Sequence, residues 1–165
     1  MLVNRNKTAR GQRGDTMIEI LVTIIIIAIG VLGTAALQVT TLKNLSSSHS
    51  ASIAGIVADD FSNRMRGNAA AADDYLHTAK PDTYPDCAIN QCTNQQLANY
   101  DIGTWWDDMA MVLPRSEASV TRDPGGNTYV ITVRWDEDRS GSNGTNCPPQ
   151  SDADKECYQL EVTLN

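Results

Sequence analysis

The feature that most constrains this chain is an apolar segment with a single carboxylate at its head. Residues 20–37 contain no charged side chain and no proline. At a rise of about 1.5 Å per residue, a helix of this length crosses the hydrocarbon core of a bilayer. Glu19 stands directly before the run, where a charge buried in lipid costs free energy. The segment therefore predicts a membrane-spanning helix whose carboxylate needs a functional reason.

The residues before this segment indicate its orientation. Residues 1–14 include no acidic side chain and four basic ones: Arg5, Lys7, Arg10 and Arg13. By the positive-inside rule, this flank stays in the cytoplasm and the chain beyond the helix lies outside it. A length of 165 residues leaves room for one membrane anchor and one small domain.

The charge balance argues against a nucleic-acid partner. The chain has 13 basic and 20 acidic side chains, which give a net charge of -7. Because four of the 13 basic residues lie in 1–14, the remainder has nine against 20 acidic ones, a net charge of -11. A domain with this charge repels a polyanion. We therefore expect no binding to nucleic acid.

Two ordinary explanations of the N-terminal region remain open on these grounds. A secretory signal peptide has a basic region, an apolar core and small residues near its end, as at residues 34–36. A plain single-pass anchor also explains the apolar run. Neither accounts for Glu19, or for the sequence Gly-Asp-Thr-Met-Ile-Glu over residues 14–19.

Residues 14–19 and the apolar helix after them resemble the class III leader of type IV prepilins. The resemblance implies that prepilin peptidase cuts after Gly14 on the cytoplasmic side and methylates the new N-terminal amine of Asp15. Glu19 then becomes the fifth residue of the mature chain. Its implied role is in assembly, where it meets the N-terminal amine of a neighbouring subunit, since a charge in an apolar bundle needs a partner. The family usually has phenylalanine or methionine where this chain has Asp15.

Within that family the chain resembles the PilV-type minor pilins, which are type IV pilus modification proteins. The resemblance is carried by residues 17–19, by residues 29–33 and by residues 92–105, which combine a cysteine, a short helix and a tryptophan. It implies a structural subunit that is incorporated in the pilus or primes its assembly, and that serves twitching motility and adhesion. The implied partners are other minor pilins, the major pilin, prepilin peptidase and the inner membrane. The protein would sit in the bacterial inner membrane with a periplasmic domain, and then in the pilus.

Two alternatives to this function stay open. A pseudopilin of the type II secretion system has the same leader and helix. A membrane-anchored periplasmic binding domain would use Trp105 and Trp106 on a ligand surface, although aromatic residues at helical spacing more often belong to a core. No catalytic motif, metal-ligand set or cofactor motif is visible, so we expect a protein that is not an enzyme and needs no cofactor.

Beyond the apolar segment, an amphipathic pattern predicts that the helix continues in water to residue 66. The apolar residues recur at spacings near three and four: Val39, Leu42, Leu45, Ile53, Ile56, Val57, Phe61 and Met65. A glycine and an asparagine at 67–68 then give a stop signal. These boundaries divide the chain into a removed leader, a membrane or filament-core half of the helix, an amphipathic half and a globular periplasmic domain: 1–14, 15–38, 39–66 and 67–165.

The globular part is predicted to contain one short helix and a small antiparallel sheet. Thr93 and Gln96 have the spacing of a capping box, and an apolar stripe follows them up to Pro114: Leu97, Tyr100, Trp105, Met109 and Val112. Alternating apolar residues predict three strands, the first two joined by a tight turn at 125–127: 118–120, 129–135 and 158–164. The fold class is therefore α+β, with a long N-terminal helix packed on a small antiparallel sheet, which is also the type IV pilin architecture.

The four cysteines lie in the part of the chain that the leader's charge places outside the cytoplasm, where disulfides persist. Four cysteines allow three pairings. We favour the local pairing, which joins Cys87 to Cys92 and Cys147 to Cys157 and closes two short loops. A zinc site would need closer ligand spacing, so we expect no metal at these cysteines.

Residues 136–141 resemble the first half of a calcium-binding EF-hand loop, with oxygen-bearing side chains at alternate positions and a glycine at the sixth. Cys147 stands where the last ligand, a glutamate, should be. A solvated acidic turn is therefore favoured over a calcium site. His49 and His77 have no ligand partner at a suitable spacing, and we expect them to be ordinary surface or helix residues.

Overall fold

The computed structural model describes residues 15–124 and 126–164, so the predicted leader, with Gly14 and its cleavage site, lies outside the described residues. The chain separates into two compact units, Met1–Asn44 and Leu45–Asn165. Helix α1, Asp15–Gly67, contributes its first 30 residues to one unit and the rest to the other. The predicted long helix is confirmed, and it ends where the glycine and asparagine signal indicated.

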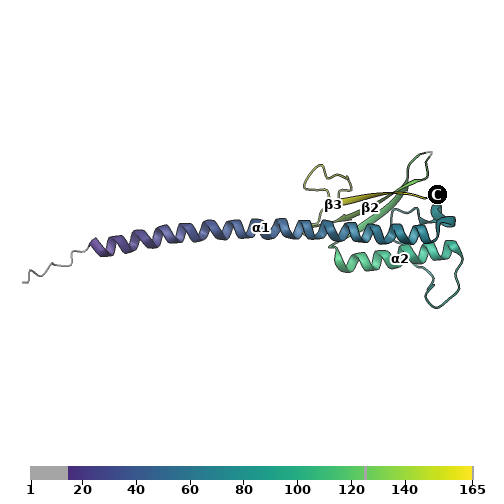
Figure 1. Cartoon of the computed structure of the whole chain (residues 1–165), viewed down its shortest axis with the longest axis horizontal. Helices are drawn as coiled ribbons and strands as arrows, with labels where there is room; N and C mark the ends of the chain where they lie inside the picture. Colours follow the sequence, from purple (N-terminus) through teal and green to yellow (C-terminus); the bar gives the residue numbers. More distant parts are fainter. Residues whose placement is uncertain (1–14, 125, 165) are drawn as a thin grey trace, which may run out of the picture. The chain divides into compact units, whose positions relative to one another are not determined.

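The second unit contains every other element (Figure 1). A 3₁₀ helix η1, Ala69–Tyr75, follows α1, and helix α2, Asn94–Val112, comes after a long connection. Three strands then form an antiparallel sheet in the order β1-β2-β3: β1 Glu117–Arg122, β2 Thr128–Trp135 and β3 Glu156–Thr163. The α+β fold class is confirmed.

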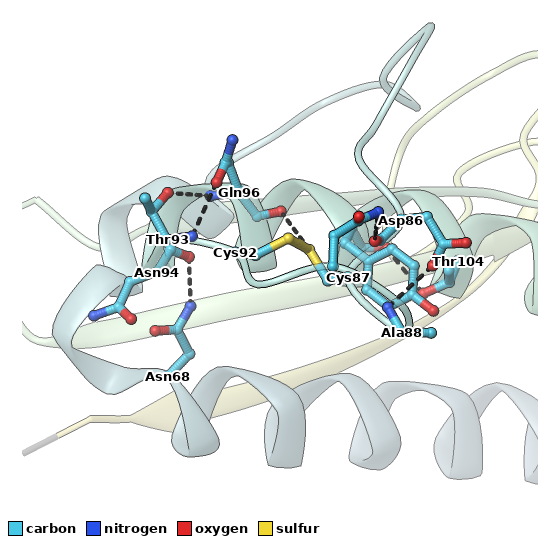
Figure 2. Close-up of a disulfide and its surroundings, with 11 residues drawn as sticks. Asn68, Asp86, Cys87, Ala88, Cys92, Thr93, Asn94, Gln96 and Thr104 are labelled. Carbon is cyan, nitrogen blue, oxygen red and sulfur yellow. Dashed lines mark hydrogen bonds between the residues drawn. A yellow bond between two sulfur atoms is a disulfide. The ribbon is translucent and has the colours of Figure 1, made fainter.

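Local sequence signals explain where α2 begins. The Thr93 side chain accepts a hydrogen bond from the backbone of Gln96, and the Gln96 side chain accepts one from the backbone of Thr93 (Figure 2). This reciprocal pair satisfies two backbone donors that a helix start leaves without partners. Asn68, just after α1, donates a hydrogen bond of 2.7 Å to the carbonyl of Asn94 and so ties the end of α1 to the start of α2.

The core of the second unit lies between the last third of α1, α2 and the sheet. In α1 the buried face is made by residues spaced four and three apart: Ala54, Ala58, Phe61 and Met65. Helix α2 buries a parallel stripe: Ala98, Ile102, Trp105 and Met109. The inner face of β2 completes the core: Tyr129, Ile131, Val133 and Trp135.

Two predicted stripes are partly wrong. On α1 the large residue Ile56 is 68% exposed, whereas the neighbouring alanines are buried. On α2 the predicted Val112 is 50% exposed. The buried stripe of this helix instead starts with Ala98 and Ile102 and does not include Val112. Position 103 of this helix needs a glycine, since a Cβ there would lie 2.1 Å from the ring of Tyr84. In both helices small residues form part of the buried face, and some large residues that the pattern placed inside are exposed.

Candidate assembly surface

The first unit presents an apolar surface along α1. Between Met17 and Leu45 the large apolar side chains are 50% to 73% exposed. This is the one helix of the described residues that is long and apolar enough to cross a membrane. Water does not tolerate a continuous apolar surface of this extent, so the segment must be covered by lipid or by other apolar helices.

Four threonine hydroxyls within this segment are satisfied by the helix itself. The hydroxyl of Thr23 donates to the carbonyl of Ile20 at 2.8 Å, and that of Thr34 donates to the carbonyl of Val31 at 2.9 Å. Two more threonines, Thr40 and Thr41, bond back to carbonyls one turn earlier. A hydroxyl that bonds its own helix adds little cost in an apolar environment. The segment therefore behaves as an apolar rod despite its four threonines.

Glu19 is the one acidic side chain between Met17 and Leu45. It is exposed on the first turns of α1 and makes no ion pair with any described residue. No further charge follows it until Lys43. Asp15 is the first residue of α1, four positions earlier, so the two acidic residues stand one turn apart on the helix. The N-terminal end of the segment is its only acidic part.

A polar contact lies at the start of the second unit. Glu137, just after β2, accepts hydrogen bonds from Ser46 of α1 at 2.9 Å and from the indole of Trp135 at 2.8 Å. Burial alone raises the pKa of Glu137, but hydrogen bonds from Ser50, Trp135 and Ser46 outweigh it and lower the pKa. The carboxylate thus fixes residues 46–50 of α1 to the end of β2.

The C-terminal end of α1 is held by Arg64. Its guanidinium bonds Asp60 at 2.8 Å on its own helix, and reaches Thr104 at 2.8 Å and Asp108 at 3.5 Å on α2. Nearby, the hydroxyl of Tyr75 donates to Asp101 at 2.6 Å. These contacts join α1, η1 and α2 through polar groups at the edge of the core.

Both disulfides close short loops of the second unit. Cys87 is joined to Cys92 in the connection before α2 (Figure 2), and Cys147 is joined to Cys157, which lies in β3. The Cα atoms are 5.7 and 5.8 Å apart. The pairs are those of the local pairing that the spacing favoured.

The acidic turn after β2 is exposed at residues 138–140, as expected, but Asp136 at its start is buried. Asp136 is 1% exposed, and its carboxylate accepts hydrogen bonds from the backbone of Ser140 at 3.2 Å and of Gly141 at 2.9 Å. Its oxygens therefore close the turn, and one of them lies 3.8 Å from the guanidinium of Arg115. Within residues 15–124 and 126–164, no three acidic, histidine or cysteine side chains are grouped to hold a metal ion.

The two histidines have different surroundings, so their common description as surface or helix residues is wrong for one of them. His49 is exposed on α1, as expected. The imidazole of His77 instead packs near the rings of Phe61, Trp105 and Trp106. Burial lowers the pKa of His77, partly offset by the hydrogen bond to the carbonyl of Tyr75. The spacing of His77 gave no signal of this, because its neighbours come from α1 and α2.

The two tryptophans of the predicted pair also have different surroundings. Trp105 is 1% exposed, and its ring stacks on Phe61 with the centroids 4.1 Å apart. It belongs to the core. Trp106 is half-buried and lines a cleft beside β1. A ligand surface made by both rings together is therefore excluded.

A family model for Tt1218-like proteins, described as type IV pilin Tt1218, matches residues 36–103. This match supports the type IV pilin superfamily. It covers the later part of α1, η1, the first disulfide loop and the first half of α2. No curated protein and no solved structure matches the chain.

The exposed apolar helix fits the pilin match. Type IV pilins are structural proteins that assemble with other pilins, and the long apolar helix with its small α+β domain fits a membrane-anchored pilin. Of the residues predicted for the site, Glu19 lies on the apolar surface and the four cysteines lie in the other unit. The assembly surface and the disulfide loops are thus separate features of the chain.

Proposed function

We propose that this protein is a minor pilin of a type IV pilus, made as a prepilin and built into a pilus or into the complex that primes it. Prepilin peptidase cuts after Gly14 and methylates Asp15. The apolar part of α1 anchors the subunit in the inner membrane, with the leader in the cytoplasm and residues 67–165 in the periplasm. The same part later packs against the helices of other minor pilins and of the major pilin.

The observation that carries this proposal is the position of Glu19 on the apolar surface of α1. The flanking side chains Ile18 and Ile20 are 69% and 57% exposed, so whatever covers them also covers the carboxylate. A buried carboxylate needs a cation. The N-terminal amine of an adjacent processed subunit supplies one at the same depth of the bundle.

The PilV-type subgroup is part of the proposal and rests on sequence resemblance. Residues 17–19, 29–33 and 92–105 carry that resemblance. Twitching motility and adhesion follow from this subgroup. The type II pseudopilin is the alternative, since the same helix and small sheet serve both systems.

Mass spectrometry of the mature N-terminus tests the proposal directly. We expect a first peptide that begins at Asp15 and carries one added methyl group. Replacing Gly14 by a bulky residue should leave uncleaved precursor in the membrane. A mature protein that still begins at Met1, or that begins near Ala36, would exclude a prepilin. Deletion that reduces piliation but leaves protein secretion intact separates the pilin from the pseudopilin.

A further inference from the structure

A cleft with a volume of about 540 Å³ opens beside β1, one of the two edge strands of the described sheet. Its walls come from the segment 78–80, from Trp106 of α2, from residues 117–119 of β1, from Arg134 of β2 and from Thr145. This volume is in the range of small-molecule sites. None of its lining residues belongs to α1.

The cleft exists because a strand-like pairing stops after one residue pair. The backbone of His77 exchanges two hydrogen bonds with Val120, of 3.2 Å and 2.8 Å, and the chain at 78–80 then leaves the strand. Successive residues of a strand point their backbone groups to opposite edges. Ala118, two residues before Val120, therefore faces the same edge, and the described chain forms no backbone pair with it there. The cleft keeps backbone donors and acceptors on one wall.

Among the charged side chains that line the cleft, Arg134 forms no ion pair with any described residue. Glu117 pairs with the buried Lys155 at 2.5 Å, and Lys80 pairs with Asp107. Arg134 has neutral partners within the described part of the chain: its Nε donates to the carbonyl of Thr145 at 3.0 Å and its Nη1 donates to the hydroxyl of Ser119 at 3.1 Å. Burial lowers the pKa of Arg134, and the negative charge of its cross-strand partner Glu117 offsets this only in part, so a further anion would stabilise the guanidinium.

The chemistry of the lining narrows the ligand. A guanidinium binds carboxylate or phosphate through paired N–H donors. Because the carboxylate of Glu117 lines the same cleft, a singly charged carboxylate is favoured over a dianionic phosphate. An aromatic side chain, Trp106, lines the cleft together with three hydroxyl side chains: Thr78, Ser119 and Thr145.

We propose that this cleft binds an acidic sugar, a pyranose ring bearing one carboxylate. The carboxylate pairs with the guanidinium of Arg134, and the ring lies against Trp106. Ring hydroxyls bond Glu117 and the threonine and serine side chains of the lining. This binding is independent of the assembly role of α1.

Titration of the full chain in detergent micelles, with tryptophan labelled by ¹⁵N, tests the proposal with methyl glucuronide as the probe. We expect the indole signal of Trp106 to shift saturably, with a dissociation constant on the order of 1 mM. Neutral methyl glucoside should bind at least about tenfold more weakly, because it lacks the anion that Arg134 pairs with. Equal shifts with both sugars, or no saturable shift with glucuronide, would overturn the proposal.

Variants of Arg134 assign the contact. Arg134→Gln should weaken glucuronide binding about tenfold or more, whereas Arg66→Gln, which removes a charge at the end of α1, should leave it unchanged. Arg134→Lys keeps the charge and gives the answer where the glutamine variant does not fold. Lysine cannot form the paired contact, so we expect several-fold weaker binding. Undiminished affinity in Arg134→Lys and Arg134→Gln would contradict the assignment.

Discussion

The indole nitrogen of Trp105 donates a hydrogen bond of 2.9 Å to the backbone carbonyl of Val57. The same indole ring stacks on Phe61, one turn further along α1. One side chain of α2 therefore contacts α1 through both an apolar face and a polar edge. The stacking holds α2 against α1. The hydrogen bond also fixes the position of α2 along the axis of α1, because only one carbonyl of α1 accepts it.

Trp105→Phe tests the polar half of this contact. Phenylalanine keeps an aromatic ring beside Phe61 but loses the donor to Val57 and leaves a smaller ring in a closed core. We expect the free energy of unfolding to fall by about 1 to 3 kcal/mol in urea titration. Trp106→Phe is the matched control, since the indole nitrogen of Trp106 has no partner among the described residues. A larger loss in the control would contradict this account.

His77 makes stability dependent on pH. Its pKa lies below 6.5 in the folded chain because the ring is buried, whereas the unfolded chain takes up the proton at about 6.5. The unfolded state therefore binds more protons as the pH falls below about 7, and the folded state is destabilised until the pH passes the lower folded pKa. For one extra proton bound by the unfolded state, the free energy of unfolding changes by up to about 1.4 kcal/mol per pH unit.

His77→Asn should remove this slope between about pH 7 and pH 5, as measured by the midpoint of urea unfolding at each pH. Asparagine keeps a donor that can reach the carbonyl of Tyr75 but does not titrate. The aromatic neighbours of the ring are Phe61, Trp105 and Trp106. His49→Gln, at an exposed site on α1, should leave the slope as it is. An unaltered slope in His77→Asn would refute this assignment.

The disulfides should contribute unequally. Cys147 and Cys157 are ten residues apart, and Cys87 and Cys92 are five apart. The loop-entropy relation gives about 3 kcal/mol for the longer loop and about 2 kcal/mol for the shorter. Alanine pairs at each site, compared by urea unfolding, should therefore lose stability in that order without losing the fold. The reverse order would show that packing around the loops outweighs chain entropy.

The sequence predicted the backbone elements better than the packing. Capping at Thr93, the alternation in β2 and the stop after α1 are local signals, and each was confirmed. The buried faces depended on which element lies opposite, so Ala54 was missed and Ile56 was placed inside. A pattern that weighs large apolar residues cannot identify a face on which close approach selects alanine.

The functional surfaces also differ in how well the sequence predicted them. Residues of the assembly surface are consecutive in one helix, and its exposed apolar face with Glu19 was therefore readable from the sequence. The cleft at Arg134 was not, because its lining comes from α2, two strands and two loops. Burial of Asp136 was also missed, since the backbone donors it accepts from depend on the folded turn.

Glu137→Gln tests the contact at the start of the second unit. The variant keeps the shape of the side chain but replaces a charged acceptor, which receives hydrogen bonds from Ser46 and Trp135, by a neutral one. We expect amide hydrogen exchange at residues 46–50 to become several-fold faster while the core amides of β2 stay protected. Glu156→Gln, an exposed change at the start of β3, is the control. Faster exchange throughout the domain in Glu137→Gln would indicate a global loss of stability instead.

Glu19→Gln separates assembly from insertion. The variant should insert in the membrane and be processed as before, because the helix becomes less polar and Gly14 is untouched. Incorporation into pili should fail, since a neighbour's N-terminal amine then lies in an apolar bundle without its counter-ion, at a cost of several kcal/mol. Crosslinking to other pilins and counting pili measure this. Lys43→Gln, which removes the charge at the other end of the apolar segment, is the control and should still assemble. Normal piliation in the Glu19 variant would mean that the carboxylate is tolerated at the membrane interface and has no part in subunit contact.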